Sequence, residues 1–498
     1  MPRSEHEGGP ATLEATEPQT GAEARPSAAS APTDPHGPRR PWLLLGAALA
    51  CVAFAGLSVA FLLPSTPSYD PWAWIVWGRE IDHGVLHTGL GPSWKPGPVL
   101  LTTIFGLAAG LGPSLWLLAA RAAGLLALLA AYRLGERLAG RWAGAIAALG
   151  LLLTEGWLGL LARGASEPAL VGLVLGSVLC HLEGRRRAAF GLAVAAALIR
   201  PEVWPFLGLY TIWLWFREPR RFRWVLVGGL ALIPLLWIGP PWIGAGDPLN
   251  ASTHAARYNG HLGDNPALEA LRRGVGLAVL PVLLLGLAAV VRAVRVRDRV
   301  ALALAGGALA WLALVVVMSA IAFPGLPRFM LPAAALWCVL AGAGAVHVVR
   351  LGRGPLGVAL AVALVAVAVP LCLHRAELLG NQARSARSAH DQFAQLTLAI
   401  GRSGGRRRIL RCSPRRVGVN HALQTALAWK LDTPLRRVRP VMRGSGWAFS
   451  AGRRARLGAG PKFAFAPTKL VPIADAGPWR VEAVFAGRDR PARPGCPA

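Results

Sequence analysis

The sequence predicts an all-α protein that crosses a membrane many times and ends in a small α+β domain. Three observations predict this fold class. Of the 498 residues, 54% are hydrophobic and 16% are charged, and the mean hydropathy is +0.45, whereas about a quarter of the residues in soluble domains are charged. Long apolar runs alternate with short charged connections up to residue 373, and residues 374–498 then become polar.

The positive charge of the chain does not indicate a nucleic-acid-binding protein. Lys and Arg number 53 against 25 Asp and Glu, which gives a formal net charge of +28. A DNA-binding domain gathers such charge on one soluble face, whereas here arginines separate long apolar runs. The bias toward Arg, Ala and Gly is typical of a GC-rich coding sequence. The composition therefore excludes a cytosolic enzyme and predicts no nucleic-acid partner.

The chain is expected to begin with a disordered cytoplasmic tail, residues 1–41. This segment is rich in Pro, Ala, Glu and Ser and has no apolar period, so it cannot bury a core. Arg39 and Arg40 precede the first apolar run, 42–63, and favour a cytoplasmic N-terminus. Because the run starts late and exceeds 20 residues, it predicts a signal anchor rather than a cleaved signal peptide.

Eleven apolar runs are predicted to be membrane spans. Arginine-rich connections alternate with connections that are poor in arginine and contain Trp, Pro and acidic residues. If the first kind is cytoplasmic and the second external, every span reverses direction as required, and the C-terminus lies outside. The predicted spans are 42–63, 113–132, 142–160, 168–182, 188–200, 203–216, 224–243, 274–291, 300–322, 330–349 and 356–373.

Three of the apolar segments need separate treatment. Residues 188–200 and 203–216 are each shorter than the roughly 17–25 residues of a usual span, so they form either two short spans or one re-entrant hairpin. Residues 97–111 are apolar as well, but a span there would reverse all later loops. We therefore expect a helix that lies in the interface or against the bundle, within a first external loop at 64–112.

The predicted transmembrane core, 42–373, is followed by a predicted extracytoplasmic domain, 374–498. Short strand-like patches in this domain are 408–412, 462–466 and 480–485. Cys412 and Cys496 both belong to it, and a disulfide between them suits an oxidising compartment. Its many arginines either bind acidic polysaccharide or lipid headgroups or only form a solvated face.

The first external loop carries the residues that most clearly suggest chemistry. Asp70 could accept a proton from a hydroxyl at the membrane surface, although Asp70 followed by Pro71 is also a favourable helix start. The aromatic residues could stack on a sugar or form an interfacial aromatic belt. The candidate substrate-binding residues are Tyr69, Trp72, Trp74, Glu80, Asp82, His83 and, beyond this loop, Glu202.

Further charged residues stand at breaks between apolar runs, where charge is costly unless it faces a cavity or another charge. Glu167 is a second candidate acid, or a charge favoured at a helix N-terminus. Candidate phosphate-binding groups are Lys95, Arg163, Arg200 and Arg328. The alternatives are interfacial snorkelling for Lys95 and Arg328 and a structural ion pair between Arg200 and Glu202. The sequence has no zinc-site spacing and no phosphate-binding loop motif.

The order of these motifs resembles the GT-C superfamily of integral-membrane glycosyltransferases, especially the branch of protein O-mannosyltransferases and aminoarabinose-lipid A transferases. The segment Lys95-Pro96-Gly97-Pro98 resembles their Lys/His-Pro-Pro motif, and Leu134–Gly140 resembles their cytoplasmic turn. The resemblance covers roughly residues 42–216 and continues more weakly to 349. The chain departs from the pattern in its single Asp-Pro pair and in Gly97, which replaces a proline.

The resemblance implies a GT-C-like fold and a multi-pass enzyme of the cell membrane. Such an enzyme transfers a hexose or pentose, with inversion, from a polyprenyl-phosphate-linked donor to a glycan, lipid or protein of the cell envelope. It implies that Asp70 activates the acceptor or holds a metal and that Glu167 is the second acid. Whether a divalent metal is needed stays open, and no other cofactor is implied.

Two other functions remain open at the level of the sequence. One is a transporter or flippase for a lipid-linked sugar, and the other is a non-catalytic membrane protein of envelope assembly. Transporters place ionisable groups near the bilayer midplane and have halves related by symmetry, whereas the acids here are predicted at the external side and no repeat is evident.

Overall fold

The computed structural model describes residues 41–108, 110–257, 264–321, 323–351, 354–413, 416–452, 460–487 and 496. The chain divides into two units, Met1–Gly46 and Ala47–Ala498. The described residues of the first unit are the start of the first helix, and the predicted disordered tail otherwise lies outside the described residues. Apart from the start of that helix, the features below belong to the second unit.

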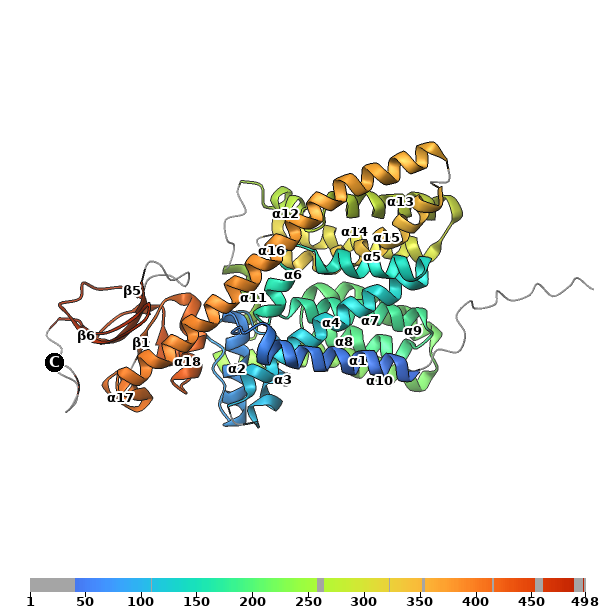
Figure 1. The fold of residues 1–498 in the computed structure, drawn as a ribbon. Coiled ribbons are helices and arrows are strands. Elements are labelled where there is room, and N and C mark those ends of the chain that lie inside the picture. Colours follow the sequence, from blue (N-terminus) through green and yellow to red (C-terminus); the bar gives the residue numbers. More distant parts are fainter. Residues whose placement is uncertain are drawn as a thin grey trace, which may run out of the picture. The chain divides into compact units, whose positions relative to one another are not determined.

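The part of the chain before the C-terminal domain is helical throughout (Figure 1). Its α-helices are α1 (Pro41–Leu57), α2 (Tyr69–Asp82), α3 (Pro96–Gly106), α4 (Gly112–Ala139), α5 (Arg141–Leu152), α6 (Trp157–Ala162), α7 (Glu167–Leu182), α8 (Arg186–Ala197), α9 (Trp204–Arg217), α10 (Arg220–Ala245), α11 (Asn250–Arg257), α12 (Pro266–Val275), α13 (Leu280–Val296), α14 (Arg299–Ala320) and α15 (Leu331–Leu351). Three short turns of other helix types join them: the π-helical η1 (Ser58–Leu62) and the 3-10 turns η2 (Pro201–Val203) and η3 (Pro327–Met330).

Every predicted span coincides with helix, but the count of eleven spans is not confirmed. In the described part of the chain, five helices are long and apolar enough to cross a membrane: Leu45–Leu62, Gly112–Ala139, Arg220–Ala245, Arg299–Ala320 and Pro327–Arg350. The number becomes six if α12 and α13, which meet at 88°, form one bent span. The predicted run 142–160 is two helices, α5 and α6, and the helices of the pair 188–216 are joined by η2. The apolar run at 97–111 forms α3, whose 11 residues are too few to span a bilayer.

The centre of the bundle is built from α4, α5, α7, α13 and α15, which pack along one another. Small residues let these helices approach closely, as is usual in membrane bundles. A Cβ at Gly135 of α4 would lie 2.7 Å from the backbone oxygen of Ala143 in α5. Leu134 of α4, Leu151 of α5 and Leu170 of α7 are fully buried. The core therefore holds the starts of α7 and α15, where charged residues stand, in fixed positions.

The C-terminal domain follows a single long helix, α16 (Pro355–Arg402), so the chain has no helix end at the predicted boundary of 373. Figure 1 shows α16 passing α6 on its way to the sheet, and the two helices are in contact.

The five-stranded sheet has the order β2-β1-β4-β7-β6, with β1 parallel to β2 and β4 and the other pairs antiparallel. The strands are β1 (Val417–Gly418), β2 (Val438–Arg439), β4 (Gly446–Ala451), β6 (Lys469–Ala476) and β7 (Trp479–Phe485), and β3 (Val441–Met442) pairs with β5 (Lys462–Phe463) separately.

One strand prediction in this domain is wrong. Residues 408–412, expected to be a strand, belong to helix α17 (Gly405–Cys412). The buried residues Ile409 and Cys412 are three positions apart, and arginines surround them, so the segment has a helical rather than an alternating pattern. The other two patches correspond to β5 and β7. Cys412 and Cys496 are joined in a disulfide.

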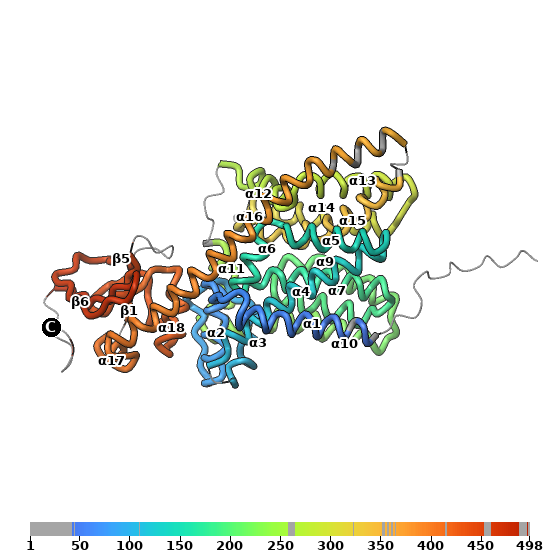
Figure 2. Tube along the Cα trace, viewed as in Figure 1, coloured from blue at the N-terminus to red at the C-terminus, as the bar shows by residue number. Residues whose placement is uncertain are grey.

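The C-terminal domain packs against the segment between α1 and α4 through α18 (Gln424–Lys430) and α2. The helices α2 and α3 lie beside one another, and α2 also contacts α18 (Figure 2). The Trp72 ring lies 4.9 Å from that of Phe393 in α16 and 6.1 Å from that of Trp429 in α18, measured between ring centroids. Arg79 donates hydrogen bonds to the backbone oxygens of Trp429 and Thr433. This contact fixes α2, whose first turn carries Asp70.

Candidate functional site

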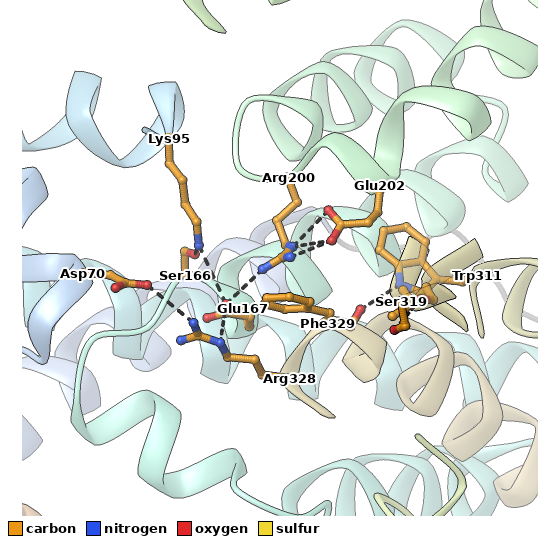
Figure 3. Close-up of polar contacts among 11 residues, drawn as sticks. Asp70, Lys95, Ser166, Glu167, Arg200, Glu202, Trp311, Ser319, Arg328 and Phe329 are labelled. Carbon is orange, nitrogen blue, oxygen red and sulfur yellow. Dashed lines mark hydrogen bonds and ion pairs between the residues drawn. The ribbon is translucent and has the colours of Figure 1, made fainter. Parts of the chain in front are cut away.

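Six charged side chains from separate parts of the chain meet at one place, which we call the charged cluster. Its members are Asp70 in the first turn of α2, Lys95 just before α3, Glu167 at the start of α7, Arg200 and Glu202 at the break between α8 and α9, and Arg328 in η3 (Figure 3). Each stands at the end of a helix or in a break, where the chain reverses direction. The folded bundle therefore brings together three predicted cations and three predicted acids.

Glu167 is the centre of the charged cluster. Its side chain is only 1% exposed, and its Oε1 atom lies 3.3 Å from Arg200 Nη1, 3.6 Å from Arg328 Nε and 3.7 Å from Lys95 Nζ. Lys95 Nζ also donates to Ser166 Oγ at 3.0 Å. Burial lowers the pKa of Lys95, and the Glu167 carboxylate opposes that shift. One buried carboxylate thus positions three basic groups that would otherwise repel one another.

Arg200 is held rigidly between an acid and an aromatic ring. Its Nε lies 3.0 Å from Glu202 Oε2, its Nη2 lies 2.6 Å from Oε1, and its guanidinium carbon is 3.5 Å from the centroid of the Phe329 ring. Arg200 has the extended backbone expected before a proline, with φ −148° and ψ 136°. The predicted ion pair with Glu202 is therefore present, and it orients Arg200 toward Glu167.

Gly97, the departure from the family motif, has a structural reason. Its N–H donates to the backbone oxygen of Leu198 at 2.9 Å, two residues before Arg200. A proline has no N–H to donate, and a Cβ at this position would lie 3.2 Å from the same oxygen. The glycine thus joins the segment that carries Lys95 to the segment that carries Arg200.

The charged cluster is open on the side of Asp70 and Arg328. Asp70 Oδ2 lies 3.6 Å from Arg328 Nη2, and the two side chains are 22% and 35% exposed, whereas Arg200 and Glu202 are buried. The N-cap of α2 is Ser68, so Asp70 lies inside the first turn and does not cap the helix. A small molecule that approaches the cluster would meet Asp70 and Arg328 first.

Other predicted site residues lie outside the charged cluster. Trp74 is adjacent, since Lys95 Nζ is 5.1 Å from its ring, whereas Tyr69 and Trp72 face the C-terminal domain. Glu80 is buried near the far end of α2, where it accepts a hydrogen bond from the backbone N–H of His87, and burial raises its pKa. The remaining three are exposed: Asp82, His83 and Arg163.

Arg121 is a buried residue near the site that the sequence interpretation left without a role. It donates to Ser58 Oγ, to the backbone oxygen of Leu63 and to Ser65 Oγ, and so holds the segment between α1 and α2. Ser65 Oγ donates in turn to the backbone oxygen of Ala162. Because this network joins the segments that precede Asp70 and Glu167, Arg121 positions both acids. An arginine within an apolar run is costly, and that cost is the signal that could have identified it.

The described residues contain no group of three or more His, Cys, Asp or Glu side chains that could hold a metal ion. The three carboxylates of the charged cluster each face an arginine.

No protein-family model matches the chain, and no curated protein sequence matches it. The fold is similar to the crystal structure of ArnT from Cupriavidus metallidurans bound to undecaprenyl phosphate, with 16% identity, a TM-score of 0.53 and coverage of 90% of this chain and 98% of that chain. The apo state of the same protein gives 16% identity and a TM-score of 0.51, over 89% and 98% of the chains. The Archaeoglobus fulgidus oligosaccharyltransferase tethered with an acceptor peptide gives 15% identity and a TM-score of 0.41, over 69% and 55%. The chain therefore shares the fold of these ArnT structures, which agrees with the fold that the resemblance of its motifs implies.

Proposed function

We propose that the protein is an integral-membrane glycosyltransferase that moves a sugar from a polyprenyl-phosphate-linked donor to an acceptor hydroxyl. The acceptor would be a glycan, lipid or protein of the cell envelope, at the outer face of the membrane. The charged cluster is the observation that carries this proposal, because it sets three cations beside a partly exposed carboxylate. The fold it shares with ArnT, a protein solved with undecaprenyl phosphate, supports the class of donor.

In the proposed reaction Asp70 is the general base. The acceptor oxygen forms a bond to the anomeric carbon while the bond from that carbon to the phosphate oxygen breaks, and the electron pair leaves with the phosphate. Asp70 takes the proton of the acceptor hydroxyl. A single displacement of this kind inverts the anomeric centre.

The cations would stabilise the leaving group. A polyprenyl-phosphate sugar is a phosphodiester with one negative charge, and the polyprenyl phosphate that leaves gains a second charge as its sugar departs. The formal charges of the cluster cancel before the reaction, and the proton that Asp70 accepts leaves the cluster one positive charge in excess. Lys95 and Arg328 would contact the phosphate, and Glu167 and Glu202 would hold Lys95, Arg200 and Arg328 in position. Arg163, which is exposed and has no contact with the cluster, has no role in the proposal.

We also propose the orientation that the arginine-rich connections predict. The N-terminal tail would be cytoplasmic, and the charged cluster and the domain after α16 would be external. A reporter fused after Arg375 should then be active outside the cytoplasm, and activity of a cytoplasmic reporter at that point would contradict the orientation.

The first test is chemical profiling of a deletion strain. Loss of one envelope glycan together with accumulation of its polyprenyl-phosphate sugar is expected, and an Asp70→Asn gene should not restore the glycan. Asp247→Asn, the same substitution at a partly exposed loop position where the carboxylate accepts from the backbone N–H of Leu249, should restore it. A strain in which Asp70→Asn restores the glycan as well as the wild-type gene would refute the role of Asp70 and favour a non-catalytic protein.

A binding measurement tests the cations separately from catalysis. Undecaprenyl phosphate is a polyprenyl phosphate, the kind of product that the proposed reaction releases. It should bind Arg328→Gln about tenfold more weakly than the wild type, since one charged hydrogen bond is lost. Arg133→Gln is the control, because Arg133 is also a partly exposed arginine in an ion pair but lies in α4 away from the cluster. Equal affinity of Arg328→Gln and the wild type would contradict the proposal that Arg328 stabilises the leaving phosphate.

A further inference from the structure

The positive charge of the chain is concentrated in its C-terminal domain. Residues 374–498 contain 24 Lys and Arg but only 6 Asp and Glu, so this quarter of the chain carries 18 of the 28 excess positive charges. A codon bias toward arginine would raise the number of basic residues, but it would not account for the low number of acidic residues in this domain. The domain therefore has a strongly positive surface, which attracts anionic partners.

Three arginines of this domain gather without an acid between them, and we call them the arginine surface: Arg416, Arg439 and Arg443. Parallel pairing of β1 with β2 sets Gly418 opposite Arg439, so Arg416 and Arg439 lie at neighbouring strands. Arg416 and Arg443 are exposed, and the side chain of Met442, the residue before Arg443, lies against Gly418 in β1. The pKa of Arg439 is lowered by burial and further by the charges of these two arginines. The one acidic residue between positions 411 and 452 is Asp432, which pairs with Arg79 and Arg406.

The arginine surface is connected to the charged cluster by two side chains. Tyr69, the neighbour of Asp70, donates from its hydroxyl to Gln424 Oε1 at 3.2 Å. Gln424 Nε2 donates to the backbone oxygen of Val438 at 2.8 Å, and Val438 precedes Arg439 in β2. The exposed His421 also lies against Tyr69, with 4.5 Å between ring centroids. An extended ligand could therefore contact Asp70 and the arginines at the same time.

We propose that the acceptor is an acidic polysaccharide whose carboxylate or phosphate groups bind the arginine surface. This inference rests on the proposed function and adds the chemical class of the acceptor. Guanidinium groups bind such anions by paired hydrogen bonds, and binding relieves the repulsion among the three arginines. A polysaccharide fits better than lipid headgroups because one polymer can contact Asp70, pass over Tyr69 and the exposed His421, and reach the arginine surface.

The test is the affinity of the full-length, detergent-purified protein for labelled polygalacturonate, with neutral dextran as the uncharged comparison. The double variant Arg416→Gln/Arg443→Gln removes two exposed charges of the arginine surface. Arg407→Gln/Arg411→Gln removes two exposed charges from α17 and is the matched control. The first pair should weaken binding about tenfold and reduce its dependence on salt, and the second should change it less than about twofold.

Three results would overturn the inference. Equal weakening by both pairs would show binding to diffuse charge, and equal affinity for dextran and polygalacturonate would show that the charge is not recognised. Loss of binding to phosphatidylglycerol vesicles in Arg416→Gln/Arg443→Gln, with polygalacturonate binding unchanged, would assign the arginines to the membrane surface. Asp70→Asn separates this inference from the proposed function, because it should bind polygalacturonate normally while transferring no sugar.

Discussion

Replacing Glu167 by Gln tests the electrostatic account of the charged cluster most directly. Glutamine has nearly the same shape but no charge, so three cations would face two acids in a buried site. Glu167 lies within 3.3–3.7 Å of all three cations and is almost fully buried. Removing one partner of a buried ion pair costs about 3–5 kcal/mol, and we expect Glu167→Gln to lower the free energy of unfolding by that amount.

The assay is equilibrium unfolding in detergent, and tryptophan fluorescence is the signal that monitors it. Glu136→Gln is the control, because its partner Arg133 lies 3.0 Å away but both side chains are about a quarter exposed. That ion pair should contribute at most about 1 kcal/mol.

A second substitution separates charge from packing. Lys95→Met combined with Glu167→Gln restores the balance of charges, so the double variant should be more stable than the sum of the two single effects predicts. The expected coupling is about 0.5–3 kcal/mol. Strictly additive losses, or a Glu167→Gln variant as stable as Glu136→Gln, would refute the account.

Three further predictions concern the parts of the fold that support the cluster. Gly78→Ala should cost about 1–3 kcal/mol and weaken undecaprenyl phosphate binding, because its Cβ would lie 2.6 Å from the backbone of Thr102 in α3; Gly208→Ala in α9, where a Cβ meets nothing within 4 Å, should show neither loss. Burial raises the pKa of Glu80 in the folded state, so its favourable contribution is complete below the unfolded pKa of about 4.3 and is lost as pH rises through the folded value. Unfolding measured from acid to neutral pH should therefore show Glu80→Gln gaining stability relative to the wild type, and a constant difference would contradict this. Reducing the disulfide between Cys412 and Cys496, 84 residues apart, should destabilise the C-terminal domain by about 2–5 kcal/mol, and unfolding curves that coincide with and without reductant would contradict it.

The helices of the bundle were accessible from the sequence because apolar runs and arginine-rich connections are local signals. The number of helices long enough to cross a membrane could not be predicted in the same way. The break between α5 and α6 has a local signal in Gly156, whose φ is 78°. The hydrogen bond that joins this break to the bend between α12 and α13, from Glu155 N–H to the backbone oxygen of Leu277, links distant residues that no local pattern connects. The strand predicted at 408–412 failed because a segment so short shows its period only through which residues are buried.

The candidate site was predictable where charge stood in an apolar setting. Lys95, Glu167, Arg200 and Arg328 were identified by that cost and Asp70 by its place in the loop after the first apolar run, and the fold brings them together. The residues that the sequence could not connect are those joined across long separations, such as Tyr69 with Gln424 and His421. Tyr69, Trp72 and Glu80 share α2 with Asp70, but successive positions of a helix face different directions, so these side chains lie toward the C-terminal domain or the far end of α2 and outside the charged cluster. Their binding to substrate stays a prediction.

The packing of α18 on α2 limits how freely the protein can change its parts over evolution. In many enzymes an appended domain can be exchanged or lost without effect on the catalytic centre. Here the same helix carries Asp70 on its first turn and bears Arg79 and Trp72, which contact the appended domain. Altering the domain would disturb Asp70, the proposed base, as well, so substitutions on the surface of the domain should be tolerated more readily than its replacement.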